Sequence, residues 1–135
     1  MMRFADDGEL AVIVAHELAH NAMGHLEAKR TNALLGALLG ALGDIALASS
    51  GVNTGGYYAA RGAEAGALVF SQDFEREADY VAIYILALAG RPLDAAPVFW
   101  RHMAVADPRS ITLARTHPTS AERFVRMEAA IAEVA

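Results

Sequence analysis

The chain has 135 residues, of which 55% are apolar, and its formal net charge is −5 at pH 7. This length suits one domain with its own core, and the apolar content excludes a disordered tail. No dense cluster of lysine and arginine occurs, which argues against nucleic acid as a partner. Because the sequence lacks cysteine, only histidine and carboxylate side chains remain to hold a metal.

The apolar periodicity predicts an all-α fold. Asp6 and Glu9 have the spacing of a capping box at the start of the first helix. A segment rich in glycine, serine and asparagine predicts a loop, and two X-Pro pairs bracket an irregular stretch. The expected helices cover residues 9–30, 32–48, 67–89, 93–104 and 121–133, with the loop at 49–66 and the irregular stretch at 107–118.

The most apolar run covers residues 33–43 and ends at Asp44. Eleven helical residues extend about 16 Å, whereas the hydrocarbon core of a bilayer is about 30 Å thick, so this run does not cross a membrane. Its Gly36, Gly40 and Gly43 predict a helix that packs closely against another. Association with a membrane, or with a second copy, through residues 33–48 is the alternative.

The segment His16-Glu17-Leu18-Ala19-His20 carries the strongest chemical signal. At 100° per residue, His16 and His20 are about 40° apart on the helix and leave the same face. Both imidazoles can therefore bind one zinc ion. Glu17 is at the rim of that face, where it can take a proton from water and pass it to a leaving amine. The alternative is a pair of buried structural histidines.

A catalytic zinc ion needs a third protein ligand. His25 is nine residues after His16 and points about 180° away on a continuous helix, so we interpret it as structural. We also interpret His102 as structural. The acidic segment Glu75-Arg76-Glu77-Ala78-Asp79, on an otherwise apolar helix, is the best source of the missing carboxylate.

Three segments in this order resemble the HtpX-like and CAAX-prenyl-protease family of gluzincin zinc peptidases. They are the histidine motif led by Glu9, the segment from Phe70 to Asp79, and Thr116-His117-Pro118 followed by Arg123. The resemblance covers most of the chain. It implies a zinc-dependent endopeptidase that acts on unfolded or misassembled polypeptides, either associated with a membrane or in the periplasm.

The resemblance also implies roles for single residues. Glu75 matches the third zinc ligand, and Asp79 matches a group that orients a zinc-bound histidine. His117 matches a residue that approaches the metal from a C-terminal loop, where it would stabilise the oxyanion or mask the zinc; a turn histidine is the alternative. Arg123 is expected either to pair with a site carboxylate or to be a helix-face charge. Glu77 and Arg76 are expected on a solvated face.

Members of this family carry an edge strand before the histidine helix, and peptide substrates add to such a strand. The sequence begins almost at the helix, so we expect residues 1–135 to be one catalytic core, either a fragment or a minimal member, that cleaves peptides poorly alone. The other functional hypotheses are a zinc-binding, chaperone-like interaction module and a structural domain without metal. Retention of Glu17 favours the enzyme.

Overall fold

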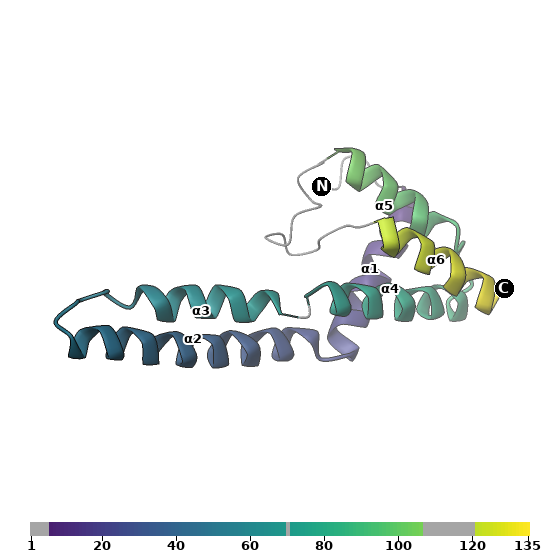
Figure 1. The fold of residues 1–135 in the computed structure, drawn as a ribbon. Helices are drawn as coiled ribbons and strands as arrows, with labels where there is room; N and C mark the ends of the chain where they lie inside the picture. Colours follow the sequence, from purple (N-terminus) through teal and green to yellow (C-terminus); the bar gives the residue numbers. More distant parts are fainter. Residues whose placement is uncertain (1–5, 70, 107–120) are drawn as a thin grey trace. The chain divides into compact units, whose positions relative to one another are not determined.

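The computed structural model describes residues 6–69, 71–106 and 121–135, and the predicted all-α fold is confirmed across these ranges, which contain no strand. Figure 1 shows the helices in chain order. Their bounds are α1 Asp7–Ala22, α2 His25–Ser49, α3 Tyr57–Leu68, α4 Ser71–Leu88, α5 Ala95–Ala106 and α6 Ala121–Val134.

The chain forms two compact units. One, which we call the core unit, combines Met1–Met23 with Gln72–Ala135 and therefore contains α1, α4, α5 and α6. The other, the hairpin, is the continuous segment Gly24–Ser71 with α2 and α3. In sequence, the hairpin is thus inserted between the two parts of the core unit.

Helix α1 begins and ends where its local chemistry predicts. Asp6 accepts a hydrogen bond from the backbone N–H of Glu9 at 2.8 Å, and the Glu9 side chain returns to the Asp6 N–H, which completes the expected capping box. The helix stops at Ala22, and Gly24 adopts a φ of 69°. The expectation of one helix over residues 9–30 is therefore wrong, because a left-handed glycine interrupts it.

The core unit buries one apolar face from each of its four helices. The buried apolar residues of α1 are small, whereas α5 contributes two aromatic rings and α6 contributes Met127. The buried apolar residues are Val12, Ala15 and Ala19 of α1, Ala78, Ala82, Ile83 and Leu86 of α4, Ala96, Phe99 and Trp100 of α5, and Met127 and Ala130 of α6.

The hairpin consists of two helices that pack side by side (Figure 1). A Cβ placed on Gly36 would come within 2.0 Å of the Gly62 carbonyl oxygen, and one on Gly40 within 1.9 Å of the Tyr58 oxygen. Only glycine permits this approach, so Gly36 and Gly40 of the predicted stripe have that role, whereas a Cβ on Gly43 would meet Tyr58 side-chain atoms only at 3.8 Å. The expected loop at 49–66 is wrong in its second half, where α3 begins at Tyr57.

Residues 50–56 connect α2 to α3, and Asp44 ties this turn to both helices. Its carboxylate accepts hydrogen bonds from the Thr54 hydroxyl and from the backbone N–H groups of Tyr58, at 3.2 Å, and Ala59, at 2.9 Å. The side chain therefore caps the N-terminus of α3 from the neighbouring helix. By length and composition alone, α2 is also the one helix among the described residues that could cross a membrane.

Candidate metal centre

His16 and His20 project from the same side of α1, as their spacing predicts. Their Nε2 atoms are 3.1 Å apart, and their ring centroids are separated by 4.6 Å. His16 is almost completely buried, whereas the side chain of His20 keeps 11% of its exposure. One histidine is therefore fixed in the core and the other borders the solvent.

Glu75 of α4 supplies a carboxylate to this pair. Its Oε2 is 3.2 Å from His16 Nε2 and its Oε1 is 3.2 Å from His20 Nε2, with the side chain fully buried. Ligands at about 2.0–2.1 Å from a tetrahedral zinc ion are about 3.3 Å from one another, close to these separations. The three residues form the metal-ligand cluster found among the described residues, with donor atoms within 4.8 Å of one another.

Asp79 lies one turn after Glu75 and contacts the other nitrogen of the His16 ring. Its Oδ1 is 3.1 Å from His16 Nδ1, and the aspartate is buried. A carboxylate this close to Nδ1 favours a proton on that nitrogen, with Nε2 directed toward Glu75 and His20. The α4 helix therefore contributes both a ligand candidate and a carboxylate beside the other nitrogen of the same ring.

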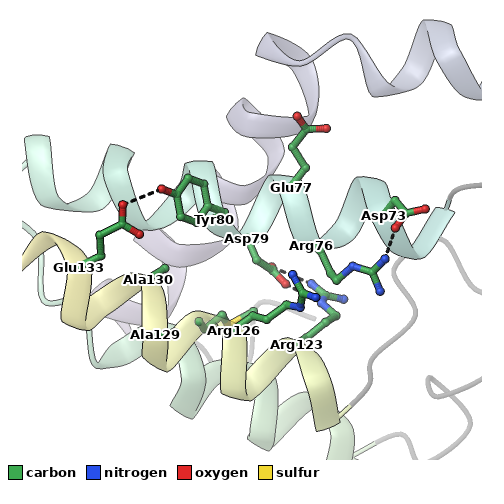
Figure 2. A pocket seen from close by; sticks show the side chains of 11 residues that line it. Asp73, Arg76, Glu77, Asp79, Tyr80, Arg123, Arg126, Ala129, Ala130 and Glu133 are labelled. Carbon is green, nitrogen blue, oxygen red and sulfur yellow. Dashed lines mark hydrogen bonds and ion pairs between the residues drawn. The ribbon is translucent and has the colours of Figure 1, made fainter.

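Arg123 of α6 contacts both acidic side chains, Asp79 and Glu75. Its Nε donates to Asp79 Oδ2 at 2.6 Å and its Nη2 to Asp79 Oδ1 at 2.8 Å, while Nη1 is 3.3 Å from Glu75 Oε2. Figure 2 shows this guanidinium directed at Asp79, beside a hollow of about 470 Å³ between α4 and α6. Of the two roles expected for Arg123, the structure shows the pairing with site carboxylates.

Trp100 of α5 contacts two members of this network, His16 and Arg123. Its ring contacts the His16 ring at a centroid separation of 5.0 Å, and the Arg123 guanidinium lies over it at 4.6 Å. The indole excludes water from His16 and holds Arg123 by a cation–π contact. The sequence did not indicate a role for Trp100, because nothing local connects it with His16 and Arg123, which are 84 and 23 positions away.

The electrostatics of His16 reflect two opposing effects. Burial is the largest and lowers its pKa, but hydrogen bonds to Asp79 and Glu75, together with their negative charges, outweigh burial and raise the pKa above its usual 6.5. In the absence of metal, the buried acids therefore favour a protonated His16. A bound cation would replace that proton and satisfy the same negative charges.

The other predicted residues lie as follows. Glu17 is exposed on α1, next to His16. His25 is buried at the start of α2, in the hairpin. Because Gly24 interrupts the helix, His25 does not share one continuous helix with His16, and their spacing does not predict that His25 points away. His102 of α5 contacts Glu9, with Nδ1 to Oε1 at 2.9 Å. Glu77 is exposed, as expected. His117 lies outside the described residues.

Two histidines one turn apart, a glutamate beside the first and a carboxylate from a second helix are the arrangement of a metal-dependent peptidase. Residues 1–131 match peptidase family M48, and the chain belongs to this family. The membership of a metallopeptidase family that the three sequence segments predicted is thereby confirmed.

Curated relatives agree with this assignment. The chain is 32% identical to the beta-barrel assembly-enhancing protease of Escherichia coli O157:H7, over 92% of this chain and 28% of that protein. It is 30% identical to the mitochondrial metalloendopeptidase OMA1 of Schizosaccharomyces pombe, over 91% of this chain and 36% of that protein. The chain thus spans about a third of the length of these relatives. No solved structure matches it significantly.

Proposed function

We propose that this chain is the catalytic core of a zinc-dependent endopeptidase, with His16, His20 and Glu75 as the zinc ligands. The observation that carries the proposal is the convergence of their donor atoms: the two histidine Nε2 atoms are 3.1 Å apart, and each is 3.2 Å from a different oxygen of the Glu75 carboxylate. Two imidazoles and one carboxylate leave a fourth position open, as a catalytic zinc requires. The buried negative charges of Glu75 and Asp79 favour a cation there.

Bound zinc supplies Lewis acidity, which polarises a carbonyl group and makes a water molecule acidic near neutral pH. The protein's own contribution is acid–base chemistry and orientation. Glu17 follows His16 on α1 and is exposed. Its carboxylate would accept the proton of the attacking water and deliver it to the amine that leaves. Asp79 holds the His16 ring in one tautomer meanwhile.

His117 completes the proposed machinery on the basis of its sequence motif alone. We propose that His117 approaches the metal from a C-terminal loop, where its imidazole either stabilises the oxyanion or masks the zinc. A His117→Gln variant separates these two roles, since kcat falls in the first case and rises in the second. A turn histidine leaves kcat unchanged.

Polypeptides that are unfolded or misassembled are the proposed substrates. The relatives, a protease that enhances β-barrel assembly and a mitochondrial endopeptidase, support protein quality control in a membrane-associated or periplasmic setting. The second candidate is a zinc-binding module that recognises polypeptides without cutting them. An apolar groove of about 510 Å³, lined by Leu10, Val14 and Leu18 of α1 and by Ile85 of α4, favours that candidate.

Metal analysis and proteolysis test these assignments together. We expect one zinc ion per chain, lost in His16→Ala/His20→Ala and in Glu75→Ala but retained in His25→Ala, which removes a buried histidine of the hairpin. Glu17→Gln should keep the zinc and abolish cleavage of casein. Stoichiometric zinc in the double histidine variant contradicts the ligand set. Because the core alone is expected to cleave poorly, zinc without cleavage supports the binding module only where a longer chain that includes the family's edge strand is inactive as well.

A further inference from the structure

The large apolar side chains in the middle of α2 form an exposed edge that the structure leaves uncovered. Each side chain is between 56 and 72% exposed, although leucine and isoleucine are residues usually buried in a protein core. We call this set the leucine edge; it consists of Leu34, Leu35, Leu38, Leu39, Leu42 and Ile45. An exposed apolar patch of this extent marks an interaction site.

Four residues of the leucine edge face away from α3, namely Leu34, Leu38, Leu42 and Ile45. Leu35 and Leu39 border α3 and line a hollow with Gly62, Ala65, Gly66 and Val69. At 100° per residue the members of the edge cover an arc of about 140°, and the centre of that arc is roughly 150° from Gly36 and Gly40, which contact α3. The edge is about 18 Å long, since its twelve positions each rise 1.5 Å. The hairpin is therefore amphipathic as a pair of helices, with α3 on the side opposite the centre of the apolar arc.

The hairpin is packed with its small residues inside and its large ones outside. Glycines on both helices bring the backbones together, as at Gly66, where a Cβ would come within 2.1 Å of the Asn32 oxygen. The leucine edge thus borders the α2–α3 interface only through Leu35 and Leu39. Small residues between helices and large aliphatic residues around them are the pattern of helices that associate in lipid.

Several polar groups argue against a hairpin that crosses the bilayer. Arg61 and Glu64 of α3 form an ion pair at 2.7 Å, and both side chains are more than 60% exposed. The connecting turn presents Asn53 and the backbone of Gly55 and Gly56, all exposed. Crossing would place these groups in hydrocarbon, where an irregular turn facing lipid is not tolerated. A hairpin lying flat keeps them in water.

The composition of the edge distinguishes lipid from a protein partner. Its six residues are all aliphatic, whereas protein interfaces concentrate their binding energy in tryptophan, tyrosine and arginine. We propose that the hairpin lies in the plane of a membrane surface, with the leucine edge immersed at the boundary between headgroups and acyl chains and α3 facing the water. The inference is independent of the zinc ligands, because all its residues belong to the hairpin.

The absence of cysteine makes site-specific labelling straightforward. Four single-cysteine variants each carry an environment-sensitive fluorophore. The labelled positions are Leu38 on the leucine edge, Arg61 on α3, Asn53 in the turn and the exposed Leu88 of the core unit. On vesicles of phosphatidylcholine and phosphatidylglycerol, the label at position 38 should shift to the blue and be quenched by nitroxide lipids. The other three labels should not respond, and position 53 should stay open to an impermeant thiol reagent outside the vesicle.

A matched pair of double variants tests the edge itself. Leu38→Asn/Leu42→Asn should lower vesicle partitioning about tenfold or more, because two leucines that would be immersed in the membrane are replaced by polar residues. Leu88→Asn/Val105→Asn removes two exposed apolar residues of the core unit and should leave partitioning unchanged. Circular dichroism and zinc stoichiometry verify the fold of both variants.

Three results would overturn the proposal. Protection of position 53 from the external reagent would indicate a hairpin that crosses the bilayer. A dimer in light scattering that dissociates in Leu38→Asn/Leu42→Asn, without quenching by nitroxide lipids, would identify a second copy as the occupant. Equal partitioning of the two double variants would show that the leucine edge does not bind the membrane.

Discussion

Arg123 holds Asp79 through two hydrogen bonds, from Nε to Oδ2 at 2.6 Å and from Nη2 to Oδ1 at 2.8 Å, and both side chains are buried. The same aspartate contacts His16 Nδ1. The three side chains therefore form a line from α6 through α4 to α1. A substitution at Arg123 is therefore expected to affect His16 indirectly, through Asp79.

Arg123→Met should lower the free energy of unfolding by about 3 kcal/mol and weaken zinc binding, because it leaves Asp79 buried without its cation. Arg123→Lys should recover part of this loss, since lysine keeps the charge but lacks the planar fork. The measurements are urea denaturation of the metal-free chain and competition for zinc with a chelator. Arg126→Met is the control, because its pair with Glu122 is exposed and should contribute less than about 0.5 kcal/mol.

Asp79→Asn should reduce zinc affinity between about tenfold and a hundredfold, because an amide no longer fixes the His16 ring as strongly. Chelator competition at constant pH measures this change. Asp73→Asn, at an exposed aspartate of the same helix that pairs with Arg76, should bind zinc as the unaltered chain does. Equal affinities in all three proteins would mean that Asp79 has no influence on the metal.

Stability without metal should depend on the protonation of His16. Its pKa is raised in the folded state by Asp79 and Glu75, despite the opposing effect of burial. The protonated ring therefore stabilises the fold fully below its unfolded pKa of about 6.5, and this contribution disappears as the pH rises through the folded pKa. Zinc binding has the opposite dependence and strengthens over the same range, because zinc replaces the proton.

Urea denaturation of the metal-free chain across this pH range tests the first trend, and zinc titration tests the second. Asp79→Asn should make both pH profiles shallower, since it removes one of the charges that raise the pKa. A stability that increases from pH about 6 to about 8 without metal would contradict the assigned direction.

Gly40→Ala should destabilise the hairpin, whereas Gly43→Ala should not. A Cβ at residue 40 would come within 1.9 Å of a backbone oxygen, but one at residue 43 meets Tyr58 side-chain atoms at 3.8 Å. Alanine at 43 also gains about 1 kcal/mol of helix propensity. Hydrogen exchange of α2 and α3 measures the difference, and equal protection in the two variants would show that the helices do not depend on this approach.

The sequence predicted that His16 and His20 share one face of α1, because that arrangement depends only on helical spacing within five residues. It also predicted the capping box at Asp6 and the acidic helix that carries Glu75. Trp100 was missed as a neighbour of His16, since their contact joins distant parts of the chain. The assignment of His16, His20 and Glu75 as zinc ligands stays a prediction until the metal is measured.

The loop expected at 49–66 illustrates the other limit. Gly62 and Gly66 lower the intrinsic helix propensity of α3, so local reasoning favours a loop. The helix exists because these same glycines let it approach α2, and Asp44 caps its first turn from a distance of 14 and 15 residues. Neither source of stability is visible in a window of a few residues.

The order in which the chain folds follows from the inserted hairpin. His20 and Glu75 are about 55 residues apart in sequence, and bringing them together carries a loop-closure entropy cost. Once α2 and α3 have joined near Asn32 and Gly66, only about 20 residues outside that contact remain to be closed. The saving is below about 1 kcal/mol by the logarithmic dependence on loop length. Local helix pairing of this kind is fast, so the hairpin is expected to form first and the metal ligands to meet last.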